Sequence, residues 1–252
     1  MRTVLWMSTW MAATALGGCG VEDERVGAEA AAIQGGARDA SDPAVGMVWI
    51  EGGGFCSGTL IAPDVVLTAG HCVEDAIAAF ETGSGGAGAP DVGEEPIAGF
   101  VAHAVIDQVA HPSYRSEDAC PNSTFDVGLV RLARPITSVK PLAIAARPPA
   151  RDATCRTVGY GVHNSSVTRM TVEQKRSATE RVLAVDGTSV KVTRKSGIVD
   201  HGDSGGPLLC AGRIAGVTSC GSDGVYPHHR VASYARVDTV DDWIQQTIAS
   251  WR

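Results

Sequence analysis

The chain has 252 residues, 44% of them hydrophobic, which is enough to bury a sizeable core in one large domain or two small ones. Its 21 basic and 28 acidic residues give a net charge of −7, which argues against nucleic-acid binding as the main activity. Its 30 glycines favour strands and turns over long helices.

An export signal is predicted at the N-terminus. Arg2 precedes a largely apolar stretch from Val4 to Leu16, which is too short to span a bilayer. We therefore predict a signal peptide over residues 1–18, a propeptide or tether over 19–32, and a single folded domain over 33–252.

Cys19 ends a sequence, LGGC, that resembles the bacterial lipobox. In that motif the cysteine carries lipid and becomes the new N-terminus, which would anchor the protein to the bacterial cell envelope. Ordinary signal cleavage after Ala15 is the alternative. On either path the chain is exported, so disulfides are permitted. The chain has seven cysteines, and assigning Cys19 to lipid leaves an even number suited to three bridges.

Short runs of strand-forming residues follow one another from Ile33 onward, with turn residues between them. This pattern is typical of a β-sandwich or barrel. Only the C-terminal end has helical spacing, with apolar residues recurring from Val240 to Trp251. The predicted strand runs are 47–50, 55–62, 65–69, 100–109, 127–132, 181–185, 190–193, 208–209, 214–218 and 231–237.

Three separated segments carry the residue types that nucleophilic catalysis needs. In GDSGGP, glycines around Ser204 leave room for a substrate carbonyl, and the amides of Gly202 and Ser204 can converge on one point. A serine hydroxyl needs a base, which His71 offers within TAGHC, and Asp126 begins the otherwise mostly apolar DVGLVRL. A buried carboxylate there requires a partner such as an imidazolium. Each segment alone has a structural explanation, but the three together favour catalysis.

These blocks resemble the three catalytic blocks of the chymotrypsin/trypsin family of serine proteases, and the resemblance covers residues 33–252. It implies an all-β fold of two packed six-stranded antiparallel β-barrels with a C-terminal α-helix. It also implies that Ser204 is the nucleophile, that His71 is the general base, and that Asp126 orients the imidazole. The amides of Gly202 and Ser204 would form the oxyanion hole. The order of the three residues, and the short chain after the serine, exclude an α/β-hydrolase.

The resemblance further implies a substrate-binding region. Ser219, Cys220 and Gly221 align with the strand that pairs with substrate backbone. Ile198 stands six residues before the nucleophile, where the family has the residue at the base of the primary pocket, so we predict preference for apolar or small side chains. Asp200, nearby, could instead supply a negative charge.

Ile33 begins the sequence IQGG, which resembles the mature N-terminus of the family. The resemblance implies that cleavage before Ile33 frees an ammonium that pairs with buried Asp203, and that the uncut chain is a zymogen. Ala32 precedes the cut, so the unknown activating protease is not expected to be trypsin-like. If Cys19 carries lipid, the same cut would release the enzyme from the membrane. The alternative is that Ile33 merely begins a strand.

Two disulfides are implied by the resemblance, and they are Cys56–Cys72 and Cys155–Cys210. A third, Cys120–Cys220, is plausible because these regions face each other across the substrate cleft in the family. Two free thiols are the alternative.

No cofactor or metal is expected, since the cysteines form no CxxC pair and the histidines fit no HExxH spacing. The expected partners are protein or peptide substrates, and the chain is expected to be a monomer. A catalytically silent binding module on the same scaffold and an esterase remain open as alternative functions.

Overall fold

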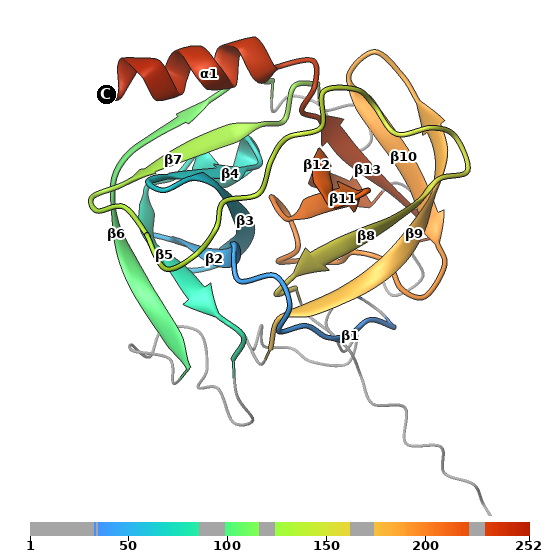
Figure 1. The fold of residues 1–252 in the computed structure, drawn as a ribbon, viewed down its shortest axis with the longest axis horizontal. Helices are drawn as coiled ribbons and strands as arrows, with labels where there is room; N and C mark the ends of the chain where they lie inside the picture. The colour runs from blue at the N-terminus through green and yellow to red at the C-terminus, as the bar shows by residue number, and fades with distance from the viewer. Residues whose placement is uncertain (1–32, 34, 86–98, 116–123, 162–173, 222–229) are drawn as a thin grey trace, which may run out of the picture.

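The computed structural model describes residues 33, 35–85, 99–115, 124–161, 174–221 and 230–252. Cys19, Cys120 and the predicted signal peptide and tether lie outside these residues. The described chain folds into two closed six-stranded antiparallel β-barrels and one C-terminal helix, which confirms the predicted fold class. Figure 1 shows the two barrels beside each other, the first coloured blue to green and the second yellow to red.

The first barrel closes in the strand order β2-β3-β4-β7-β6-β5. Strands β4 and β7 pair antiparallel, so that Thr68 at the end of β4 faces Gly128 at the start of β7. The segments just after β4 and just before β7 therefore leave the barrel at the same edge. The strands are β2 (Val45–Ile50), β3 (Phe55–Ala62), β4 (Val65–Thr68), β5 (Ile77–Gly83), β6 (Phe100–Ala110) and β7 (Gly128–Leu132).

The second barrel has the strand order β9-β10-β13-β12-β11-β8, and pairing of β8 with β9 closes it. The two-residue strand β1 (Ala37–Arg38) adds to the outside of β9. This pairing brings the start of the described domain onto the second barrel before the chain enters the first. The strands are β8 (Thr154–Gly159), β9 (Arg176–Val185), β10 (Ser189–Arg194), β11 (Pro207–Cys210), β12 (Arg213–Gly221) and β13 (Val231–Arg236).

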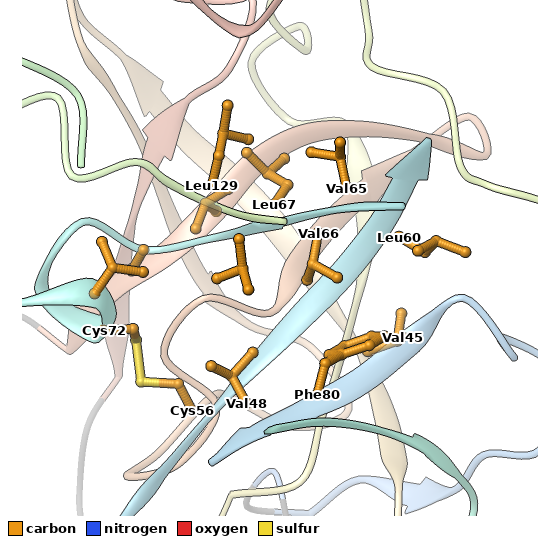
Figure 2. Packing of buried hydrophobic residues seen from close by; sticks show 14 of the residues in the cluster. Val45, Val48, Cys56, Leu60, Val65, Val66, Leu67, Cys72, Phe80 and Leu129 are labelled. Atoms are coloured by element: carbon orange, nitrogen blue, oxygen red, sulfur yellow. A yellow bond between two sulfur atoms is a disulfide. The ribbon is translucent and has the colours of Figure 1, made fainter. Parts of the chain in front are cut away.

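Buried apolar side chains from the strands fill the barrels. Figure 2 shows the centre of the first barrel, where Leu60, Leu67 and Phe80 are completely buried and the Cys56–Cys72 disulfide lies at the edge of the cluster. Removing a buried leucine or phenylalanine of this kind typically costs about 2–5 kcal/mol. The core therefore fixes the ends of β3 and β4 from which the functional segments emerge.

The C-terminal helix α1 (Asp241–Ser250) packs against the first barrel's core through Ile244 and Ile248. Asp241 and Asp242 occupy its first turn, where negative charge interacts favourably with the helix dipole. Among the described residues, no helix has the length and apolar character needed to cross a membrane.

Candidate active site

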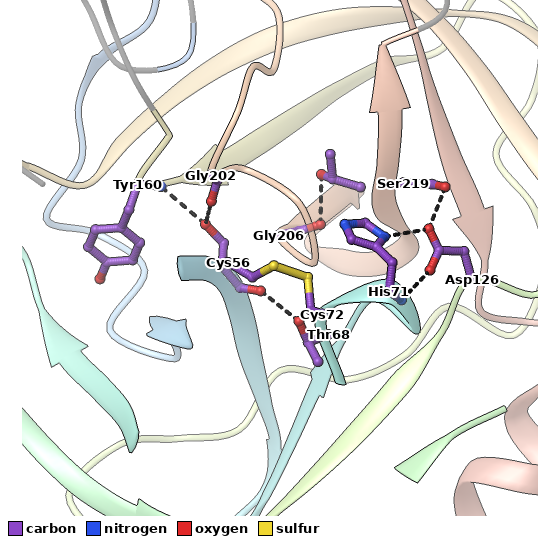
Figure 3. Close-up of a disulfide and its surroundings, with 11 residues drawn as sticks. Cys56, Thr68, His71, Cys72, Asp126, Tyr160, Gly202, Gly206 and Ser219 are labelled. Carbon is purple, nitrogen blue, oxygen red and sulfur yellow. Dashed lines mark hydrogen bonds and ion pairs between the residues drawn. A yellow bond between two sulfur atoms is a disulfide. The ribbon is translucent and has the colours of Figure 1, made fainter. Parts of the chain in front are cut away.

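His71 and Asp126 meet because β4 and β7 are paired. His71 begins a short 3₁₀ helix (His71–Val73) just after β4, and Asp126 lies two residues before β7. Asp126 Oδ1 accepts a hydrogen bond from the backbone N–H of His71 at 2.9 Å, and its Oδ2 lies 2.9 Å from His71 Nδ1. Ser219, on β12 of the second barrel, donates its hydroxyl to the same Oδ2 at 2.6 Å (Figure 3).

The two charges of this pair stabilise each other. Asp126 is 1% exposed, and burial alone would raise its pKa, but the hydrogen bonds from His71 and Ser219 and the charge of the imidazolium lower it. Burial would likewise lower the pKa of His71, yet the bond to Asp126 and its charge raise it above 6.5. With Asp126 ionised, Nδ1 carries the proton, which leaves Nε2 of the neutral ring as a proton acceptor.

The turn that carries Ser204 requires glycine at two positions. Gly202 and Gly205 have φ of +90° and +81°, in the left-handed region that other residues rarely adopt. A Cβ at Gly202 would lie 2.6 Å from the ring of Phe55, and one at Gly205 would collide with the carbonyl of Ser57. The turn therefore packs directly against β3 of the first barrel, which explains the glycines of the GDSGGP segment.

Ser204 lies on the wall of a cavity of about 270 Å³. Ser219 lines this cavity as well, so one residue both contacts Asp126 and borders the space in front of Ser204. The three residues assigned from the sequence to substrate backbone binding are all in the wall. The complete lining of described residues is Val199, Asp200, His201, Ser204, Thr218, Ser219, Cys220 and Gly221.

Ile198 lies behind this wall rather than in it. Its side chain is fully buried in the second barrel's core, against neighbours that include Leu208 and Tyr234. Asp200 does line the cavity, with only 2% of its side chain exposed, and its Oδ1 lies 2.7 Å from Nδ1 of the exposed His201. The Asp200 carboxylate therefore lies beside the cavity, with its Oδ1 hydrogen-bonded to His201.

Asp203 is completely buried directly before Ser204. Its two carboxylate oxygens accept hydrogen bonds from the amides of Gly161 and Asp200, each at 2.8 Å. Burial raises its pKa to about 7 in spite of these two bonds. Ile33 is also fully buried and has a φ of 49°. No cation pairs with Asp203 within the described part of this uncut chain.

Each barrel contains a disulfide. Cys56 on β3 is bonded to Cys72, which follows His71, and in the second barrel Cys155 is bonded to Cys210. Because the sulfurs of Cys56 and Cys72 are bonded to each other, they are not available as metal-binding thiolates beside His71. Cys220 is also in a disulfide. Its predicted partner, Cys120, lies outside the described residues.

The sequence model of the trypsin family, described as "Trypsin", matches residues 33–244. The chain belongs to the trypsin family. As a member it is a serine endopeptidase, a hydrolase whose substrates are proteins or peptides. Its disulfides are those of a protein that folds in an oxidising compartment, which supports export.

Relatives of this trypsin-family chain include venom enzymes of snakes. It is 30% identical over 224 residues to the snake venom serine protease pallabin of Gloydius halys, covering 77% of this chain and 78% of that one. It is 27% identical over 221 residues to the thrombin-like enzyme acutobin of Deinagkistrodon acutus, covering 77% of each.

Solved structures share the two-barrel fold. A structure described as that of GrC has a TM-score of 0.70 and 23% identity, covering 86% of this chain and all of that one. Neuropsin, a serine protease expressed in the limbic system of mouse brain, has a TM-score of 0.68 and 23% identity, covering 84% of this chain and 98% of that one. These likenesses show the fold.

Sequence reasoning missed two features of the site. It assigned Ser219 to substrate binding but did not foresee its hydrogen bond to Asp126. It gave no role to Ser57, which contacts the turn of the nucleophile. The glycines at 202 and 205 were the available signal, because they indicate close approach by another segment without identifying it.

Proposed function

We propose that this trypsin-family enzyme cleaves peptide bonds through Ser204, His71 and Asp126. The observation that supports it best is the hydrogen-bonded pair of His71 and buried Asp126, joined by Ser219 to the cavity that Ser204 lines. A serine hydroxyl is a poor nucleophile until a base removes its proton. An imidazole held by its Nδ1 presents the other nitrogen for that purpose.

In the proposed reaction, Ser204 Oγ attacks the scissile carbonyl carbon while His71 Nε2 takes the hydroxyl proton. The amides of Gly202 and Ser204 donate to the oxyanion that forms, and Asp126 stabilises the imidazolium. His71 then protonates the leaving amine, the C–N bond breaks, and an acyl-enzyme remains. Water deprotonated by His71 attacks this ester, and the proton returns to Ser204 as the acid product leaves.

Kinetics on a peptide substrate test this proposal. Ser204→Ala should reduce kcat by about 10⁴-fold or more, because the covalent path is lost while the cavity remains. Ser189→Ala is a matched control, since it removes a buried hydroxyl on β10 that bonds Asp186. A Ser204→Ala enzyme with undiminished peptide hydrolysis would overturn the assignment, and loss of ester hydrolysis alone would favour an esterase.

We propose that cleavage before Ile33 activates the enzyme. The new ammonium would pair with Asp203, whose buried carboxylate accepts hydrogen bonds from backbone amides alone among the described residues of the uncut chain. A cation at contact distance stabilises a buried carboxylate by several kcal/mol. N-terminal sequencing of the active enzyme should begin at Ile33, and an active form still carrying Cys19 would contradict this route.

We propose a preference for apolar or small side chains before the scissile bond. The cavity wall includes Val199 and Gly221, and the Asp200 carboxylate is hydrogen-bonded to His201. Cleavage-site profiling on a peptide library tests this. Preferred cleavage after lysine or arginine would instead assign Asp200 as the determinant of specificity.

We propose that residues 1–18 direct export and that Cys19 carries lipid in a bacterial envelope until the cut before Ile33 releases the enzyme. The described bridges use four of the seven cysteines, and Cys220 is bonded as well. Lipid on Cys19 thus requires Cys120 as the partner of Cys220. Peptide mapping without reduction should find Cys120–Cys220, and a Cys19–Cys220 peptide would exclude lipidation.

A further inference from the structure

Ser57 on β3 is completely buried, and each of its polar groups is hydrogen-bonded. Its backbone N–H donates to the carbonyl of Ser204 at 2.7 Å, and its hydroxyl donates to the carbonyl of Gly202 at 2.9 Å. The hydroxyl also accepts from the N–H of Tyr160 at 3.2 Å, and the Ser57 carbonyl accepts from Thr68 at 2.9 Å. Figure 3 marks the hydrogen bonds of Tyr160 and Gly202 with dashed lines.

The two carbonyls that Ser57 binds belong to the same residues whose amides form the proposed oxyanion hole. Their peptides are held from the second barrel through N–H groups, since Asp203 donates to Asp200 and Gly205 donates to Thr218. Among the described residues, both hydrogen bonds that reach residues 202–205 from the first barrel come from Ser57. The first barrel thus hydrogen-bonds the turn through a single described residue, beside the packing of Phe55 against Gly202.

Restraint of this kind matters most at Gly202. A glycine with a φ of +90° has no side chain whose packing could limit rotation of the adjoining peptides. A hydrogen bond from a fully buried hydroxyl supplies that limit, and it is strong in a low-dielectric interior. An oxyanion donor stabilises the transition state only when it is aimed in advance at the developing charge.

We infer that the Ser57 hydroxyl is a positioning group for the oxyanion hole, acting through the Gly202 carbonyl. The inference rests on the proposed roles of Gly202 and Ser204. Ser57 follows Cys56, whose disulfide to Cys72 lies beside His71. The base and the oxyanion donors, although they come from different barrels, therefore share one support on β3.

The test compares Ser57→Ala with the wild-type enzyme, both produced as full chains and activated in the same way. Removing the hydroxyl should lower kcat for a peptide by about 10- to 50-fold, less than the loss of a whole oxyanion donor. KM should stay within about twofold, because ground-state binding does not use the oxyanion donors. The affinity for a peptidyl trifluoromethyl ketone, which forms a tetrahedral adduct, should fall by the same factor as kcat/KM.

Ser189→Ala is the control, because it also removes a buried hydroxyl and should leave both the kinetics and the ketone affinity unchanged. If Ser57→Ala does not fold, Ser57→Gly replaces it, and its kcat should fall by at least about threefold. The loss is smaller than for alanine because water could occupy the vacated space and bind the Gly202 carbonyl. Unchanged kcat, or a loss confined to KM, would overturn the inference. Failure of the proposed function looks different, since the wild-type enzyme itself would then form no adduct with the ketone.

Discussion

Two aspartates of the candidate site are almost equally buried and have opposite electrostatics. Asp126, 1% exposed, faces a titratable imidazole, and its pKa is lowered. Asp203, 0% exposed, faces only amides in the described chain, and burial raises its pKa to about 7. Burial alone therefore does not decide the charge of a carboxyl group here. The partner decides it, and of the two only Asp126 has an ionic partner among the described residues of the uncut chain.

Asp126→Asn should have the largest effect on this comparison. The asparagine removes the charge that raises the pKa of His71 and favours the wrong tautomer, so kcat near neutral pH should fall by about 10⁴-fold. The acid limb of the kcat profile should also move to lower pH, because only the charge of Glu74 then opposes the lowering of the His71 pKa by burial. An acid limb that stays in place would show that Asp126 does not control the base.

Asp203→Asn should separate activity from the stability of the uncut chain. In the activated enzyme it removes the proposed partner of the Ile33 ammonium, so kcat/KM should fall by about 10²- to 10³-fold as the oxyanion hole loosens. In the uncut chain it removes a buried acid whose raised pKa makes stability fall as pH rises, so the variant should lose less stability than the wild type between pH 5 and 8. Urea unfolding of both uncut chains at the two pH values checks this, and equal losses would contradict the raised pKa.

Glu180 is a third buried carboxyl group, and it tests the same effect of burial. Burial raises its pKa to about 8, although the hydroxyl of Tyr234 donates to it at 2.6 Å. Because the folded pKa lies above the unfolded value, its contribution to stability is present below about pH 4 and is lost as pH rises to 8. Between pH 5 and 8 the uncut wild-type chain should lose about 2–4 kcal/mol more stability than Glu180→Gln. Parallel pH profiles for the two chains would contradict the raised pKa.

Ser219→Ala should have the smallest effect. It removes one hydrogen bond to Asp126, while the two contacts with His71 remain. We expect kcat to fall by about 3- to 10-fold, less than the full cost of about 1.5–3 kcal/mol for one bond to a charged group, because His71 still holds Asp126. The thermal midpoint should change little. A loss as large as that of Asp126→Asn would mean that Ser219, rather than His71, keeps Asp126 ionised.

The sequence predicted much of the fold because strand-forming runs and turn residues alternate. The predicted run 55–62 matches β3 in both bounds, and the helical spacing after Val240 matches α1. Strands β5 and β8 and the two-residue β1 were missed. Strand β5, Ile77–Gly83, is rich in alanine and buries Glu81, and strand β8, Thr154–Gly159, has few apolar residues. Their pairing with neighbours, rather than local preference, makes them strands.

The site was predictable only where chemistry leaves a pattern. A serine between glycines, a histidine and an aspartate form a recognisable set in that order. Ser57 leaves none, because its partner Gly202 lies 145 residues away in the chain and any small residue would fit a strand pattern there. The sequence also does not reveal the opposite pKa shifts of Asp126 and Asp203, because both aspartates lie among similar buried residues.

Labelling by a fluorophosphonate tests catalysis by Ser204 and His71 most directly. The chain is labelled before and after cleavage at Ile33, and the adduct is located by mass spectrometry. We expect a single adduct on Ser204 of the cut enzyme and loss of labelling in His71→Ala. Labelling of the uncut chain should be much slower, because the Ile33 ammonium that would pair with Asp203 has not been freed. Labelling of another serine, or equal labelling of Ser204 without His71, would contradict it.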